Sequence, residues 1–230
     1  MEPLKFPYQL LELTHTLDEN SPAWEENCGF SSSIVLDYAD CDLRNPFRVQ
    51  HFTMPAGMGT HMDAPSHCCT DGLSIDQIPL NQLVSPCVVI DVSQKAHELY
   101  SVAPQDIADF EKAHGLIQPD SFVIIKTGWS RFWDTPIQYR NNHHFPSVSA
   151  ETATLLVSRG IVGLGVDTLS PDRPDDGYPV HHILLSSGRY IIENIANSEQ
   201  LPSTGSFVMA FPLKIRGATE APMRLIGLLP

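Results

Sequence analysis

The sequence predicts a β-rich α/β domain, and three apolar runs support this fold class. PCVVIDV at 86–92, FVIIKTGW at 122–129 and IVGLGVD at 161–167 have the length and β-branched composition of buried strands. A helical pattern lies between each consecutive pair of runs. This alternation is typical of a mixed sheet covered by helices.

The first third of the chain contributes further strands. Residues 10–17 have a strand-like mixture of side chains, and residues 31–53 alternate loosely between apolar and polar. Both patterns are typical of strands with one exposed face. The expected sheet is therefore larger than a plain doubly wound fold requires.

Two helices are predicted by the signals at their ends. The first spans 103–114 and is stopped by Gly115. The second begins at Ser149 as its N-cap and is stopped by Gly160. After them, the chain adds three further strand-like segments: RYIIEN, SFVMAF and APMRLIGLL.

Length and composition fit a single domain over residues 1–230. No linker, internal repeat or low-complexity segment divides the sequence, and 42% of its residues are hydrophobic, enough for a sizeable core. The net charge of -13 comes from 27 acidic and 14 basic residues, without a run of Lys or Arg. This charge argues against nucleic acid or an anionic membrane surface as a partner.

The cysteines favour a reducing compartment. The sequence has five of them without a CxxC pair, and an odd number cannot all pair within one chain. Reduced thiols in the cytoplasm are the simplest interpretation. The N-terminus does not have the pattern of a signal peptide, and no apolar run reaches the roughly 18 residues of a membrane span.

Potential metal ligands and proton carriers are concentrated in MPAGMGTHMDAPSHCCTDGLSID at 54–76. In an extended backbone His61 and Asp63 project from the same face, so one cation could bind both. Pro65 favours a turn after this pair, which would bring His67 back toward it. The segment therefore predicts either a metal site or a proton-transfer site.

A second polar segment follows the third buried run. The loop at 170–179 is proline-rich and acidic, and His181 and His182 come directly after it. Glu193 lies within YIIENI, where a buried carboxylate is costly unless a positive charge meets it. Taken singly, the two histidines could cap a helix and Glu193 could face water.

Together the two segments resemble the putative cyclase family of metal-dependent hydrolases, which includes bacterial kynurenine formamidases and isatin hydrolases. The family signature HxGTHxDxPxH is matched here by Gly59, Thr60, His61, Asp63, Pro65 and His67. The resemblance extends over nearly the whole chain, through DGLSIDQIPL at 71–80, KTGW at 126–129, GVDTLSPD at 165–172, the segment 181–193 and FPLKI at 211–215. It implies a single cyclase-like domain with a mixed-sheet ββα sandwich, assembled into a homodimer or homotetramer.

The resemblance also implies a site for one or two divalent ions. His61 and Asp63 would bind the first ion, and Asp63 would bridge to a second ion bound by His181 and Glu193. His67 would be the general acid and base. Zn²⁺ and Mn²⁺ both suit ligands of this type.

The implied reaction is hydrolysis of an amide bond in a small molecule, either an aryl formamide or a cyclic amide. A metal-activated water would attack, and His67 would carry the proton. Trp24 would contact the substrate, although composition alone favours the core for a large aromatic residue. Two alternatives stay open: a metal-dependent cyclase or dehydratase, and a non-catalytic relative that only binds a metal or ligand.

One position departs from the signature, because Gly57 stands where its first histidine belongs. The first ion site then lacks a ligand, and we expect one firmly bound ion instead of two. Cys69 is a candidate replacement, since in an extended chain it would lie on the side of His67; a small buried cysteine is the simpler interpretation. Gly57→His is expected to raise metal occupancy.

Overall fold

The computed structural model describes residues 5–42 and 44–230 and contains one large mixed sheet. Its strands are β1 (Gln9–Glu12), β4 (His61–Asp63), β5 (Val84–Asp91), β7 (Phe122–Lys126), β9 (Gly163–Val166), β10 (Tyr190–Glu193), β11 (Ser206–Pro212) and β12 (Glu220–Leu229). Their order is β1-β12-β11-β5-β7-β9-β10-β4. β4 pairs with β12 as well as with β10, so the sheet closes on itself like a barrel.

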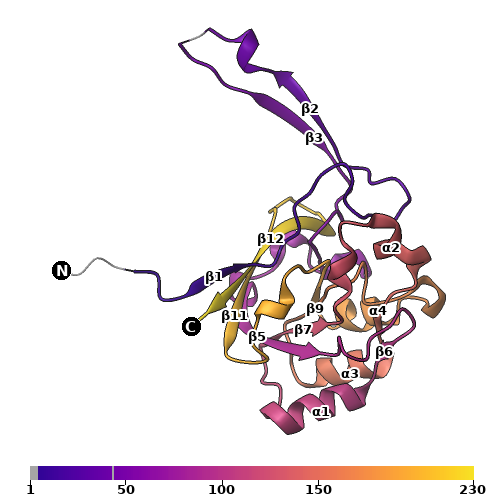
Figure 1. Ribbon diagram of the computed structural model, residues 1–230. Helices are drawn as coiled ribbons and strands as arrows, with labels where there is room; N and C mark the ends of the chain where they lie inside the picture. Colours follow the sequence, from indigo (N-terminus) through magenta and orange to yellow (C-terminus); the bar gives the residue numbers. More distant parts are fainter. Residues whose placement is uncertain (1–4, 43) are drawn as a thin grey trace.

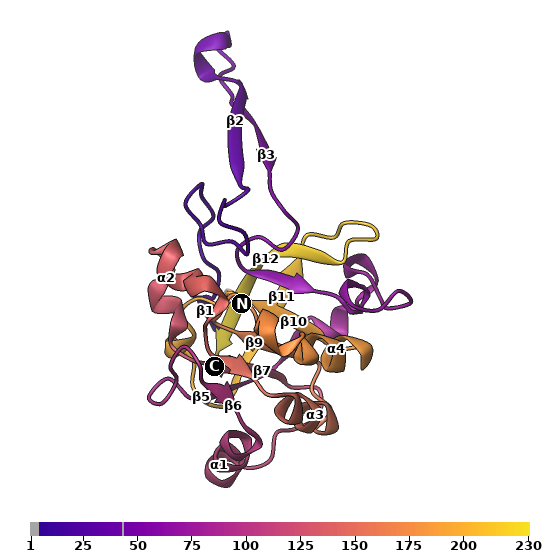
Figure 2. The ribbon, with the colours of Figure 1, turned by 90° about the vertical axis from the view of Figure 1, so that its right-hand side faces the viewer.

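Helices cover the outer face of the parallel part of this sheet (Figures 1 and 2). Strands β5, β7, β9 and β10 run parallel to one another. These helices are α1 (Pro104–His114), α3 (Ala150–Ser158) and α4 (Pro179–Ser186), whereas the short helix α2 (Pro136–Arg140) contributes Tyr139 to a separate aromatic cluster. Apolar residues of α1, α3 and α4 form one core cluster with residues of the four parallel strands.

The strand β7 shows why its sequence is apolar without alternation. Val123 and Ile125 pack against the helices, whereas Phe122 and Ile124 belong to the core inside the closed sheet. All four side chains are buried. Strands buried on both faces are typical of parallel sheets, and each such side chain contributes about 1.5–3 kcal/mol by its burial.

A hairpin of β2 (Ser31–Leu36) and β3 (Val49–Thr53) projects from this body (Figures 1 and 2). These strands pair only with each other among the described residues. The hairpin exposes large apolar side chains, with Ile34, Val35 and Phe52 at 51%, 67% and 53%. A two-stranded hairpin is marginally stable alone in water, so an arm of this kind is unusual without a partner surface.

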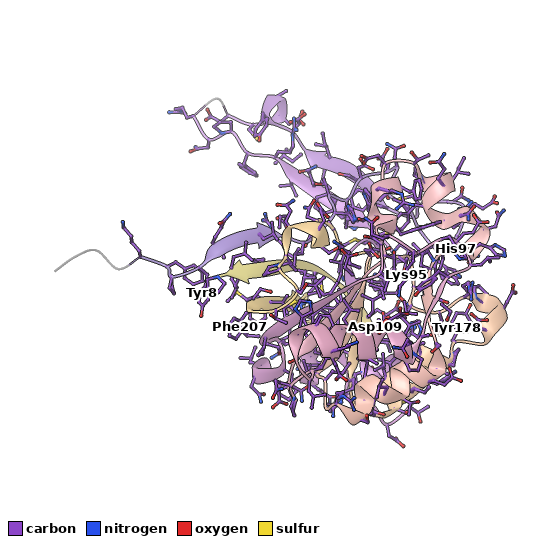
Figure 3. All side chains as sticks on the ribbon, turned by 60° about the horizontal axis from the view of Figure 1, so that its bottom comes forward. Tyr8, Lys95, His97, Asp109, Tyr178 and Phe207 are labelled. Atoms are coloured by element: carbon purple, nitrogen blue, oxygen red, sulfur yellow. The ribbon has the colours of Figure 1, made fainter. Side chains whose placement is uncertain are left out.

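The first and last strands of the large sheet lie side by side. β1 pairs antiparallel with β12, from Gln9 opposite Leu229 to Glu12 opposite Ile226. Just before β1, Tyr8 packs edge-on against Phe207 of β11, with 6.1 Å between the ring centroids (Figure 3). The first and last strands are thus held in one layer.

The predicted elements agree with the structure in type and differ from it at some boundaries. The helices predicted over 103–114 and after Ser149 are confirmed as α1 and α3, and Ser149 accepts a hydrogen bond from the Thr152 amide. The strand predicted over 10–17 ends at Glu12, with one isolated bridge at Thr14. Helix α4 was not predicted.

The closed sheet confirms the β-rich α/β class with a mixed sheet, and the finer description as a ββα sandwich stays a prediction. No helix in the described ranges has both the length and the apolar composition needed to cross a bilayer.

A pair of short strands, β6 (Ser101–Val102) and β8 (Ser147–Val148), forms a second small sheet before α1 and α3.

Candidate functional site

The short strand β4 positions the first two candidate ligands. His61 and Asp63 are buried and share one face of the strand, while Met62 between them points into the core. Pairing with β10 sets Glu193 opposite His61. The extended conformation predicted for this pair is therefore confirmed.

A turn brings His67 toward the same place. The 3-10 helix Pro65–His67 follows β4 directly, as predicted from Pro65. The His67 side chain is 33% exposed, and its ring centroid lies 5.9 Å from that of His181. His67 thus combines access to solvent with a position beside the buried residues.

Helix α4 supplies His181 from its first turn. Asp172 caps this helix, because its carboxylate accepts hydrogen bonds from the backbone N–H groups of Val180 and His181, at 3.0 and 2.9 Å. It also lies 2.7 Å from Nδ1 of the His181 ring. One buried acid therefore fixes both the helix start and the orientation of the imidazole.

The structure brings His61, Asp63, His181 and Glu193 into one cluster. The His61 Nε2 atom lies 3.3 Å from Asp63 Oδ1 and 3.4 Å from Glu193 Oε2. The His181 Nε2 atom lies 3.5 Å from Asp63 Oδ2 and 3.4 Å from Glu193 Oε1. An ion about 2.1 Å from each of two tetrahedral ligands separates them by roughly 3.4 Å, so these spacings suit a shared cation.

Hydrogen bonds at Nδ1 direct the Nε2 atoms of both histidines into the cluster. Nδ1 of His61 lies 2.8 Å from the Gly59 carbonyl, and Nδ1 of His181 faces Asp172. Each ring therefore donates from Nδ1 and turns Nε2 toward carboxylate oxygens. Asp63 Oδ1 is buried and has no hydrogen-bond partner among the described residues. This unpaired oxygen and the mixed N/O donor set fit a divalent metal ion.

The charges in the cluster lead to the same conclusion. Burial would lower the pKa of His61, but the carboxylates of Asp63 and Glu193 outweigh it and raise that pKa to about 10. Burial likewise acts against ionised Asp63, yet the two imidazoles hold its pKa below the ordinary value. Burial, and then the neighbouring Asp63, raises the pKa of Glu193. The site strongly favours positive charge, from protons or from a metal ion.

A cavity of about 500 Å³ opens above the cluster, a size suited to a small organic molecule. Its polar base contains the four clustered residues, and His67 and His182 also line it. Its apolar wall is formed by Pro22, Trp24, Pro55 and Leu169, among others. Trp24 is half-buried there and packs on His143, with 4.2 Å between the ring centroids.

Glu220, at the start of β12, is a site residue that sequence reasoning missed. It lies directly opposite Asp63 in the β4–β12 pairing and lines the cavity. His61, Asp63 and Glu220 form a second possible group of metal ligands, whose donor atoms lie within 4.8 Å of one another. Its Oε2 atom is 3.4 Å from Nδ1 of His67 and raises the pKa of that histidine.

The structure also corrects the expectation for Cys69. That expectation assumed an extended chain after His67, but the backbone from Pro65 is a 3-10 turn. Among the described residues Cys69 belongs to neither group of possible ligands, and the neighbouring Cys68 lines the cavity instead. Burial raises the pKa of the Cys68 thiol, which disfavours a thiolate. All five cysteines are free thiols in the structure.

Comparison with known proteins agrees with the geometry. Residues 11–173 match the family described as putative cyclase. A kynurenine formamidase of Maricaulis maris is 27% identical, over 95% of this chain and 97% of its own length. The solved structure of isatin hydrolase A from Labrenzia aggregata, bound to benzyl benzoate, is 32% identical with a TM-score of 0.88, over 96% and 94% of the two chains.

A further solved structure is described as a potential metal-dependent hydrolase with cyclase activity. It is 27% identical with a TM-score of 0.77, over 97% of this chain and 98% of its own. The family match covers more than half of the sequence. It includes Trp24, His61, Asp63 and His67 among the predicted site residues. The chain therefore belongs to the putative cyclase family.

Proposed function

We propose that this protein hydrolyses a carbon–nitrogen amide bond in a small aryl formamide or cyclic amide, with one or two divalent ions bound by His61, Asp63, His181 and Glu193. The convergence of these four buried side chains beneath a cavity is the observation that carries the proposal. Family membership and the hydrolase relatives support the reaction class.

The bound ion would polarise the amide carbonyl and acidify a water molecule. Asp172 and the Gly59 carbonyl hold the two imidazoles so that Nε2 faces the ion site. Glu193 and Asp63 supply the negative charge that retains the ion. Zn²⁺ and Mn²⁺ both fit this donor set.

His67 is proposed to carry the proton. Its Nδ1 faces Glu220, which leaves Nε2 as the atom able to take a proton from the attacking water. The water oxygen bonds to the carbonyl carbon, the carbon–nitrogen bond breaks, and His67 returns its proton to the leaving nitrogen. The products are an amine and a carboxylic acid, and the acid releases its proton to solvent to become a carboxylate, so atoms and charges balance.

The apolar wall of the cavity suits an aromatic substrate. Trp24 is proposed to contact the ring, since it lines the cavity and packs against His143, with the two rings tilted by 32°. Tyr178, 6.2 Å from Trp24 between centroids, extends this aromatic wall. An aryl group against these rings would direct its amide toward the buried ligands.

The test is an activity screen of the metal-reconstituted protein over formanilides, cyclic amides and lactones. We expect turnover of at least one amide, with ring opening or formate release identified by mass spectrometry, and loss of turnover after chelation. A product formed by loss of water or by ring closure would favour the cyclase or dehydratase alternative. Metal binding without turnover of any class would favour the non-catalytic relative.

We also propose a homodimer or homotetramer in a reducing, cytoplasmic environment. The exposed apolar residues of the β2–β3 hairpin support association, because a second copy would remove them from water. The five free thiols support the reducing location.

A further inference from the structure

We propose that Glu220 replaces the missing signature histidine as a ligand of the first ion, together with His61 and Asp63. This inference rests on the proposed metal site and assigns a ligand that the family signature does not contain. It reverses the expectation that Gly57 leaves the first site deficient.

The first argument is that Glu220 occupies the space of the missing side chain. A Cβ atom built on Gly57 would lie 2.4 Å from Glu220 Oε1 and 3.3 Å from His61 Nε2. Contacts under about 3 Å require something to move, so a side chain at position 57 and this position of Glu220 exclude each other. The glycine makes room for the carboxylate beside the His61 donor atom.

The second argument comes from the strand register. Glu220 lies directly opposite Asp63 where β12 pairs with β4. Like charges directly opposite each other in a sheet are destabilising. Asp63 Oδ1 also has no hydrogen-bond partner among the described residues. A cation between the two carboxylates would remove the repulsion and satisfy the unpaired oxygen.

The third argument is that Glu220 is held in place from its other oxygen. Oε2 lies 3.4 Å from His67 Nδ1, while Oε1 lies beside Gly57. The Glu220 side chain is 24% exposed, so it borders the cavity without being free in solvent. One oxygen is thus available to an ion while the other faces the proposed proton carrier.

The exchange changes the chemistry of the first site. Two carboxylates and one imidazole replace the one carboxylate and two imidazoles of the signature. Oxygen-rich sites favour harder ions such as Mn²⁺ over Zn²⁺ relative to imidazole-rich ones. The first site should therefore discriminate less strongly against Mn²⁺ than a site with the signature histidine.

The experiment is a Mn²⁺ titration of chelator-treated protein. Binding is monitored by calorimetry and by the electron spin resonance signal of free Mn²⁺. Wild type should bind two ions, and Glu220→Ala should lose one or bind it at least tenfold more weakly while keeping the other. Removal of a residue that only hydrogen-bonds to a metal ligand typically lowers metal affinity about 10- to 100-fold, so loss of a direct ligand should cost at least tenfold. Glu98→Ala, which removes an exposed carboxylate, is the matched control and should behave as wild type.

Three further variants complete the test. Gly57→His alone should weaken the first ion because the added ring meets Glu220, whereas Gly57→His combined with Glu220→Gly should recover two ions with a stronger preference for Zn²⁺. Glu220→Gln keeps the shape of the side chain and should also weaken binding of the first ion. It takes the place of Glu220→Ala in the test if that variant proves unstable in thermal unfolding.

Equal affinity and stoichiometry in wild type, Glu220→Ala and Glu220→Gln would overturn the assignment and leave the proposed function intact. Absence of any Mn²⁺ or Zn²⁺ binding by wild type would overturn both. Asp63→Ala separates these cases, because it should weaken both ions.

Discussion

The carboxylate of Asp172 lies 2.7 Å from Nδ1 of His181 and at the same time accepts two backbone N–H groups at the start of α4. The acid is 1% exposed. Because the helix and the ring share this one partner, the direction of Nε2 is built into the helix start.

Asp172→Asn should therefore lower metal affinity by about 10- to 100-fold, the usual effect of removing a carboxylate behind a ligating histidine. The neutral amide keeps the size of the side chain but no longer favours a single orientation of the imidazole. Metal affinity measured by competition with a chelating dye checks this. Asp175→Asn, an exposed residue of the same loop, is the control, and equal losses in both would contradict the prediction.

Asp63→Ala should purify with little divalent metal. Asp63 belongs to both possible ligand groups, so its removal takes a donor from each ion. Elemental analysis of protein purified without chelator provides the measurement, beside Asp18→Ala as an exposed control. Metal content equal to that of wild type would remove Asp63 from the site.

His67→Ala should retain its metal but lose turnover by about 10²- to 10⁴-fold, the usual contribution of a general acid or base. The residue lies at the exposed side of the cavity and in neither ligand group. Steady-state rates beside metal analysis separate the two effects, with His51→Ala on the hairpin as the control. Undiminished turnover would show that another group carries the proton.

His15 should make the protein sensitive to mild acid. Burial lowers the pKa of His15 to about 4, and the ring stacks on Trp133 with 3.9 Å between centroids. The unfolded chain then binds the extra proton between about pH 6.5 and pH 4, so stability falls as the pH falls through this window. The loss is on the order of 2–3 kcal/mol.

His15→Phe keeps the stacked ring and removes the titration. Urea unfolding in the presence of chelator, at pH 7 and pH 4.5, should show a smaller loss of unfolding free energy in the variant than in wild type. Equal losses of unfolding free energy in the two proteins would contradict the prediction. They would mean that His15 has the same charge in the folded and the unfolded chain.

Val35→Asp should reduce the oligomeric state. Val35 is 67% exposed on the projecting hairpin, and a charge there would oppose burial against a second copy. Light scattering after size exclusion measures the mass. Ser33→Asp on the same strand is the control, and an unchanged mass in Val35→Asp would place the contact elsewhere.

Much of the fold could be predicted because the relevant signals are local. The buried runs at β5, β7 and β9, and the end signals of α1 and α3, are contained in short stretches of sequence. Helix α4 escaped prediction because its start depends on Asp172, nine positions before His181 and across a loop. A capping residue so far from the helix in the sequence produces no recognisable spacing pattern from which the helix start could be predicted.

The same distinction applies to the site. His61, Asp63 and His67 were predicted from one short segment, and Glu193 from the cost of burying an acid among apolar residues. Glu220 was missed because its place depends on the pairing of β12 with β4, whose segments lie far apart in the chain. Strand register across such a distance is set by the closed sheet, and the glycine at 57 was the only local sign that another residue was needed.

The double pairing of β4 has a consequence for synthesis of the protein. While a ribosome is still adding residues beyond Glu193, β4 can already find β10, but its second neighbour emerges only with Glu220 to Pro222. A nascent chain that does not yet contain Glu220 therefore offers an ion only a partial set of ligands. Full loading with metal therefore has to follow synthesis of β12, the strand that closes the sheet and also delivers the last carboxylate.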